Sequence, residues 1–131
     1  MNDPMNPSKR ILVAEDNPAL AAVVRFNLVN AGFDVTVART GSKAWEELLH
    51  SSFDLVITDH QMPGMTGVEL CRNIRGEDRL KDLPVIMLTA KSIELDKEFL
   101  EREYSVLAVF AKPFSPSAIV KVVDETLAFV R

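Results

Sequence analysis

Short runs of apolar residues alternate along this chain with longer stretches in which apolar positions recur at helical spacing. Uninterrupted apolar runs are typical of strands that are buried on both faces, whereas the longer stretches are typical of amphipathic helices. Five strand-and-helix pairs follow one another in this pattern. The expected strands cover residues 11–14, 33–38, 55–58, 85–88 and 106–111.

Start signals for helices lie between these strands. Asn17 is a good N-cap and Pro18 suits the first helical turn, and Ser115 with Pro116 repeats this pair before the last helix. Thr40 opens a second helix, a third is expected after residue 67, and a charged fourth one covers residues 92–103. Helical spacing places on the inner faces Leu20, Val23, Val24, Asn27 and Leu28; Ala44, Trp45, Leu48 and Leu49; Val68, Leu70 or Cys71, and Ile74; and Ile119, Val122, Val123, Leu127 and Val130.

The order of elements predicts the fold class. Strands that alternate with helices, with few tight hairpins between them, favour parallel pairing and right-handed crossovers. Because the strands are apolar on both faces, helices are expected to cover both sides of the sheet. We therefore predict an α/β fold with a doubly wound five-stranded parallel sheet flanked by five helices. It occupies residues 9–131 after a flexible tail at residues 1–8, and a TIM barrel would need about twice this length.

Composition narrows the class further. The 131 residues suit one domain, and the net charge of −4 without a long basic block argues against direct nucleic-acid binding. The longest apolar runs are far shorter than the roughly 20 residues of a membrane span, and the start of the chain does not resemble a secretory signal. Cys71 is the single cysteine and cannot form an internal disulfide. A cytoplasmic protein without a membrane segment is expected.

Polar residues follow four of the five expected strands. Glu15 and Asp16 follow the first strand, Asp59 the third, Thr89 the fourth and Lys112 the fifth. In an open parallel sheet the carboxyl ends of the strands line one edge, and ligands bind there. Each residue alone has an ordinary explanation, since an Asp at a strand end is commonly a turn residue. Their occurrence in order at four strand ends predicts one site.

The chemistry of this set favours a divalent metal and a phosphoryl group. Two carboxylates ~4 Å apart repel by about 1 kcal/mol in water and by several times more at an effective dielectric constant of ~20. Hard oxygen ligands without a nearby Cys or His favour Mg²⁺ over zinc or copper. Three carboxylates, one divalent ion and Lys112 sum to about zero charge, so a phosphoryl dianion meets a neutral pocket. Asp59 is the best candidate nucleophile because it stands alone on the central strand, and Thr89 offers a hydroxyl donor.

Five segments resemble one known family closely. They are Ile-Leu-Val-Ala-Glu-Asp-Asn at 11–17, Leu-Val-Ile-Thr-Asp at 55–59, Met-Pro-Gly-Met-Thr-Gly at 62–67, Leu-Thr-Ala at 88–90 and Lys-Pro-Phe at 112–114. With this spacing the chain resembles a response-regulator receiver domain, the CheY-like phosphoacceptor of two-component systems, from about residue 9 to residue 131. The resemblance implies that the predicted sheet is of the flavodoxin-like, receiver type.

The resemblance implies a role for each residue at the strand ends. Asp59 accepts a phosphoryl group from a phosphohistidine on a histidine kinase or a histidine phosphotransfer protein, and Thr89 and Lys112 bind the phosphoryl oxygens. A cis peptide bond is expected before Pro113. The magnesium ligands implied are Glu15, Asp16, Asp59 and the backbone carbonyl of Gln61. The domain is then a phosphorylation-controlled interaction switch that takes part in its own phosphotransfer and dephosphorylation, and not an enzyme.

Some positions depart from the family pattern. Val109 stands where the family often has Tyr or Phe, and Phe110 beside it faces the opposite way in a strand. Residues 101–107 lack the usual Gly-Ala before the fifth strand. The surface of the fourth helix and fifth strand is nevertheless where we expect a downstream protein target, or a second copy in a homodimer, to dock. Gln61 and Lys91 occupy the two variable positions that influence the lifetime of the modification.

Two other function classes remain open from the residues. One is a phosphate-independent interaction module on the same fold, against which the retained acids and lysine argue. The other is an aspartyl-phosphate hydrolase of the haloacid dehalogenase type, which places a second Asp where this chain has Gln61. Flavin binding is disfavoured because Glu15 and Asp16 would repel a phosphate. His60 is expected to face outward without a catalytic role. Whether the chain acts alone or as part of a longer protein stays open.

Overall fold

All five strands lie in one parallel sheet with the order β2-β1-β3-β4-β5. The computed structural model describes residues 8–90 and 96–128. The strands are β1 (Arg10–Ala14), β2 (Asp34–Ala38), β3 (Leu55–Asp59), β4 (Val85–Ala90) and β5 (Ala108–Lys112). The helices are α1 (Pro18–Asn30), α2 (Gly41–His50), α3 (Gly67–Gly76), α4 (Lys97–Tyr104) and α5 (Pro116–Leu127). The predicted fold class is confirmed.

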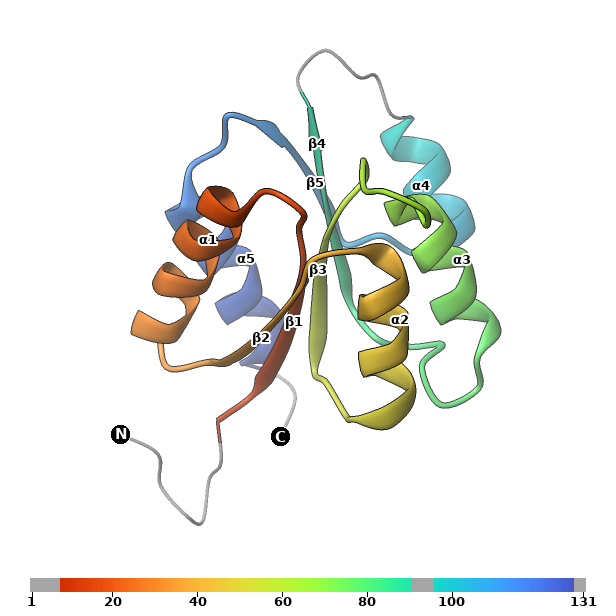
Figure 1. Cartoon of the computed structure of the whole chain (residues 1–131), viewed down its shortest axis with the longest axis horizontal. Coiled ribbons are helices and arrows are strands. Elements are labelled where there is room, and N and C mark those ends of the chain that lie inside the picture. Colours follow the sequence, from red (N-terminus) through yellow and green to blue (C-terminus); the bar gives the residue numbers. More distant parts are fainter. Residues whose placement is uncertain (1–7, 91–95, 129–131) are drawn as a thin grey trace.

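Helices cover both faces of the sheet, as Figure 1 shows, with α1 and α5 on one side and α2, α3 and α4 on the other. Alternate residues of the central strands therefore supply two cores. Leu12 and Val56 pack toward α2, α3 and α4, while Val13 and Ile57 pack toward α1 and α5. All four are fully buried. This double burial explains why these strands read as continuous apolar runs. None of the helices among the described residues is long and apolar enough to span a bilayer.

Several predicted boundaries differ from the structure. The fourth helix begins at Lys97 in the described part of the chain, where the Asp96 side chain accepts the Phe99 N–H at 3.0 Å, and the predicted start at residues 92–95 lies outside the described residues. The fifth strand begins at residue 108, because the N–H groups of Ser105 and Val106 still bond to carbonyls of α4 and the N–H of Leu107 is the first to bond to β4, at the Val85 carbonyl. Ser115 stands at the N-cap of α5, but its hydroxyl pairs with the Ser117 hydroxyl at 2.7 Å and makes no cap bond.

Two predicted core positions were wrong. Val23 is 45% exposed and Leu49 is 46% exposed, whereas Val24 and Leu48 beside them are buried. Adjacent helical residues point about 100° apart, so a narrow contact stripe excludes one of each pair. Ala21 is buried instead on α1. Val130 lies outside the described residues. The remaining predicted inner positions are buried or partly buried.

The junction between β3 and α3 is packed too tightly for a side chain. A Cβ atom added to Gly67, the first residue of α3, would lie 2.5 Å from the carbonyl oxygen of Asp59 and 2.9 Å from the Cα of His60. The N–H of Gly67 also donates to the carbonyl of His60 at 2.8 Å. The start of α3 is thereby held directly against the end of β3.

This packing predicts opposite outcomes for two glycines of the same helix. We expect Gly67→Ala to lower the free energy of unfolding by about 2 kcal/mol or more, because backbone atoms must move. Gly76→Ala serves as the control, since nothing lies within 4 Å of an added Cβ there. It is expected to leave stability unchanged or to raise it by up to about 1 kcal/mol. Urea unfolding monitored by Trp45 fluorescence measures both, and equal effects would contradict the close approach.

Candidate acidic site

The register of the sheet brings the predicted residues to one edge. Ala14 pairs with Thr58, so Glu15 and Asp59 follow directly at the ends of neighbouring strands. Asp59 pairs with Leu88 on the other side, and Ala90 pairs with Lys112. These strand ends lie toward the top of Figure 1. Convergence from distant parts of the sequence follows from parallel pairing alone.

Three carboxylates gather at this edge. Glu15, Asp16 and Asp59 each offer an oxygen, and these oxygens lie within 4.8 Å of one another. Glu15 is 0% exposed and Asp59 is 2% exposed, whereas Asp16 is exposed to solvent. Two buried carboxylates and one exposed carboxylate therefore line a shared volume that is accessible from one side.

A lysine partly neutralises the cluster. The ammonium nitrogen of Lys112 donates to Asp59 Oδ2 at 3.1 Å and lies 3.3 Å from Glu15 Oε1. The peptide bond between Lys112 and Pro113 is cis, as the resemblance implied. One cation thus faces two buried anions, and a net negative charge remains.

Two buried oxygens of the cluster lack a hydrogen-bond partner. They are Asp59 Oδ1 and Glu15 Oε1, the latter contacting Lys112 only as an ion pair. The other oxygen of Glu15 accepts the backbone N–H of Asn17 at 3.0 Å. Buried acceptors are normally satisfied, so unpartnered carboxylate oxygens at one point are suited to a cation. The donor set is made entirely of hard oxygens, which fits Mg²⁺.

Burial changes the acid–base properties of the cluster. Desolvation is the largest cause that raises the pKa of Glu15, which reaches about 7. The hydrogen bond from the Asn17 N–H lowers this pKa, the charge of Asp59 raises it, and the charge of Lys112 lowers it. Partial burial would lower the pKa of Lys112, but the hydrogen bond and charge of Asp59 together with Glu15 raise it above its usual value. Lys112 therefore stays protonated, while Glu15 loses its proton near neutral pH.

The other two predicted site residues lie close by without touching the carboxylates through any described bond. Thr89 on β4 is one residue beyond Leu88, the partner of Asp59, and is almost fully buried. Its hydroxyl donates to the Ala90 carbonyl at 3.5 Å, a long bond that leaves it able to serve another acceptor. Gln61 is exposed, and it lines a hollow of ≈ 420 Å³ together with Asp16, His60, Met62, Pro63 and Thr66.

His60 does not face outward as expected. Its side chain is half-buried, and Nδ1 is shielded from solvent without a hydrogen-bond partner. The contribution of Asn17 was also missed, because the sequence identified its side chain as a cap but gave no sign that its backbone N–H binds Glu15.

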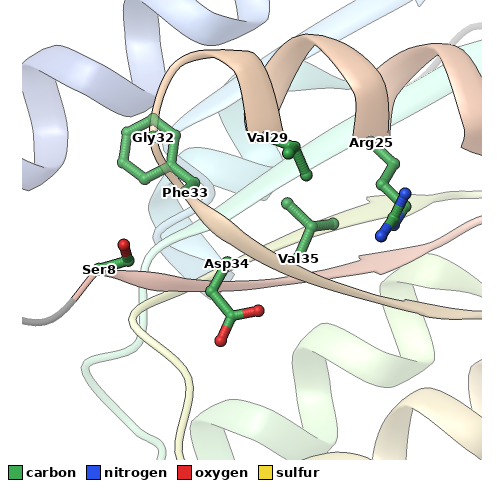
Figure 2. A pocket seen from close by; sticks show the side chains of 7 residues that line it. All are labelled: Ser8, Arg25, Val29, Gly32, Phe33, Asp34 and Val35. Atoms are coloured by element: carbon green, nitrogen blue, oxygen red, sulfur yellow. The ribbon is translucent and has the colours of Figure 1, made fainter. Parts of the chain in front are cut away.

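A hollow of ≈ 410 Å³ lies apart from the acidic cluster, between α1 and the start of β2. Figure 2 shows Arg25 and Val29 of α1 on one side of it and Val35 of β2 on the other. Ser8, Gly32, Phe33 and Asp34 complete its lining. None of the predicted site residues lines it, so it is not part of the acidic site.

A doubly wound five-stranded parallel sheet with an acidic cluster and a lysine at its carboxyl edge defines the receiver class of signalling domains. The chain belongs to the response regulator receiver domain family, whose model matches residues 11–124. It is therefore a receiver domain of the kind found in two-component response regulators, a signalling phosphoacceptor class.

Known relatives agree with this assignment. The alkaline phosphatase synthesis transcriptional regulatory protein PhoP of Bacillus subtilis (strain 168) is 33% identical over 112 residues, which is 86% of this chain but only 45% of that protein. The chain thus spans about half the length of this relative. A signal receiver domain of a signal transduction histidine kinase from Syntrophus aciditrophicus is 31% identical with a TM-score of 0.82, covering 95% of this chain and 93% of that one. The chemotaxis response regulator CheY4 of Vibrio cholerae is 27% identical with a TM-score of 0.81, covering 92% and 99%.

The raised pKa of Glu15 predicts how stability depends on pH. A carboxyl group with a higher pKa in the folded chain stabilises the fold while protonated, and this stability is lost as pH rises from about 4.5 through about 7. Relative to the parent chain, we expect metal-free Glu15→Gln to gain on the order of 2 kcal/mol between about pH 5 and about pH 8. Urea unfolding at each pH measures the difference.

Glu69 provides a control in which stability depends on pH with the opposite sign. The N–H and hydroxyl of Thr66 lower the pKa of Glu69, so its stabilising effect is present above its unfolded pKa and is lost as pH falls. Glu69→Gln should therefore lose stability relative to the parent chain as pH rises over the acid range. A pH-independent difference for Glu15→Gln would contradict the raised pKa.

Proposed function

We propose that Asp59 is a phosphoacceptor, modified by the phosphohistidine of a histidine kinase or histidine phosphotransfer protein in a Mg²⁺-dependent reaction in the cytoplasm. The observation that carries this proposal is the environment of Asp59. Its carboxylate is 2% exposed, one oxygen is bonded to Lys112, and the other has no partner. A buried carboxylate with a free oxygen beside a cation is placed to act as a nucleophile and to have its product stabilised.

The metal would be held by the carboxylates of Glu15, Asp16 and Asp59, with the backbone carbonyl of Gln61 as a further ligand. Their clustered oxygens and the unpartnered atoms of Glu15 and Asp59 support this assignment. When bound, Mg²⁺ supplies neutralisation of negative charge on the transferring group. The exposure of Asp16 suits a ligand that meets the ion from the solvent side.

The residues of the chain account for the remaining parts of the transfer. A carboxylate oxygen of Asp59 forms a bond to phosphorus while the bond from phosphorus to the imidazole nitrogen of the donor breaks, giving an acyl phosphate. Lys112 already binds Asp59, so its ammonium group is in place for a phosphoryl oxygen. Thr89, whose present hydrogen bond is weak, is our candidate for a second phosphoryl contact. Asp59, Lys112 and Thr89 would take the same positions when water hydrolyses the acyl phosphate and removes the phosphoryl group.

A docking surface for the donor borders the cluster. A hollow of ≈ 560 Å³ lies between α1 and the segment after β5, lined by Asn17, Ala19, Leu20, Val23, Lys112, Pro113, Phe114 and Pro116. Lys112 links it to Asp59 directly. On α1, Phe26 is 64% exposed near Val23. An apolar surface beside the nucleophile supports docking of the protein that carries the phosphohistidine.

Downstream, we propose that a protein target or a second copy reads the modification at the surface of α4 and β5. Phe99 and Leu107 are exposed large apolar residues of this region. Val109 packs partly buried against the core beneath α2, α3 and α4, and Phe110 packs against the opposite core. Phe110 is therefore not a substitute for an aromatic residue at position 109.

The phosphoacceptor role is tested with a small phosphodonor. Incubation with acetyl phosphate and Mg²⁺ should add one phosphoryl group to the parent chain, and none to Asp59→Asn, as read by intact mass spectrometry. Asp78→Asn is the matched control, because Asp78 is exposed and lies outside the cluster. An unmodified parent chain, both with acetyl phosphate and with an active histidine kinase, would overturn the proposal. Sustained turnover of phosphomonoesters would instead favour the hydrolase.

The metal role is tested by ligand removal. We expect Asp16→Asn to weaken Mg²⁺ binding on the order of tenfold or more, since one of three anionic ligands becomes neutral. The Mg²⁺ dependence of the thermal unfolding temperature measures this affinity, because a ligand that binds only the folded state raises that temperature. Asp78→Asn should leave the dependence unchanged. Equal Mg²⁺ responses of both variants would exclude Asp16 as a ligand.

A further inference from the structure

An arginine from α3 binds the end of α4. Arg75 lies in the last turn of α3, and its Nε donates to the Tyr104 carbonyl at 2.6 Å while Nη2 donates to the Ser105 carbonyl at 3.3 Å. Its Nη1 donates to the carbonyls of Lys81 at 3.0 Å and Leu83 at 2.6 Å. One half-buried side chain therefore joins two main-chain segments that are distant in sequence.

The end of α4 needs such a donor. The last carbonyls of a helix have no partner within the helix. Ser105 adopts the left-handed conformation with φ of 53°, and the N–H of Val106 then bonds back to the Leu100 carbonyl at 3.2 Å. Glycine usually occupies such a position because a side chain is strained there. Arg75 satisfies the carbonyls of Tyr104 and Ser105, and its charge suits the negative end of the helix dipole.

Among the described residues, α4 buries little against the rest of the domain. Leu100 is the single buried residue of Lys97–Tyr104, whereas α1, α2 and α5 each bury three residues and α3 buries four. Tyr104 is half-buried against the same core, and Phe99 is 38% exposed. Because apolar burial is small, the hydrogen bonds of Arg75 are a large share of what attaches this helix.

We propose that Arg75 is the positioning residue that clamps α4 to α3, and that α4 opens as a unit when this clamp is lost while the sheet stays folded. Opening would expose Leu100 and Val106, which are otherwise buried. The clamp is attached to the same helix whose first residue, Gly67, lies against Asp59. The inference does not depend on the proposed phosphorylation, since no residue of the acidic cluster takes part.

Amide hydrogen exchange on the whole unmodified chain tests the clamp. In Arg75→Gln, the amides of Leu100, Ser105 and Val106 should exchange at least about tenfold faster relative to those of the central strands β1 and β3. Arg72→Gln is the matched control. Arg72 lies on the same helix and also reaches Tyr104, but through the side-chain hydroxyl at 3.5 Å. We expect it to change the relative exchange of α4 by less than about threefold.

A second variant separates the shape of the side chain from its charge. Arg75→Lys keeps the positive charge but replaces three separate guanidinium nitrogens, which reach the two main-chain segments, by a single ammonium nitrogen, so α4 should again exchange faster than the strands. If α4 stayed fully protected in Arg75→Lys, the positive charge alone would explain the role of residue 75, and the proposed clamp would be wrong. Equal loss of protection in α4 and in the strands would also overturn it, because Arg75 would then support the whole fold.

Discussion

The burial of Glu15 and Asp59 beside a single lysine is the constraint on which the rest of this structure depends. Removing charged groups from water is costly unless partners compensate them, and Lys112 supplies one positive charge for two buried negative ones. Burial, with a smaller contribution from the charge of Asp59, raises the pKa of Glu15 to about 7, and one oxygen of each acid has no hydrogen bond. The free protein therefore holds an excess of negative charge that a bound cation would offset.

Such a site requires a rigid support, and the sheet supplies it. Strands β1 and β3 carry the two buried acids and are covered by packed side chains on both faces. Their apolar residues offset the cost of the charges a few positions away. The contact of Gly67 with Asp59 adds a second restraint, because the chain cannot relax sideways at the point where it leaves the sheet. The contacts that pack the core next to these strands therefore also hold the two acids in place.

Topology explains why so much of the site followed from sequence. Once the strands are parallel, residues after strands one, three and five must share an edge, and Glu15, Asp59 and Lys112 lie together there. Orientation at single positions did not follow. Glu15 is buried and Asp16 exposed because adjacent residues at a strand end face opposite ways, and the sequence did not say which faces inward. Val23 and Leu49 were misjudged for a similar reason, since helical periodicity gives a face of the helix but not the width of that face.

The sequence pattern did not indicate the hydrogen bonds of Arg75 either, because a charged residue at a helix end is usually exposed to solvent. They bear on our proposal for Asp59, because a modification there would need a second element that responds to it. A switch needs an element with two arrangements of similar free energy, and elements of low local stability are the natural candidates. Among the described helices α4 buries the fewest residues, and the hydrogen bonds of Arg75 reach its last turn. Because residue 109 is a valine, our proposal assigns the transmission of a signal to the attachment of α4 to α3 and not to an aromatic side chain at this position.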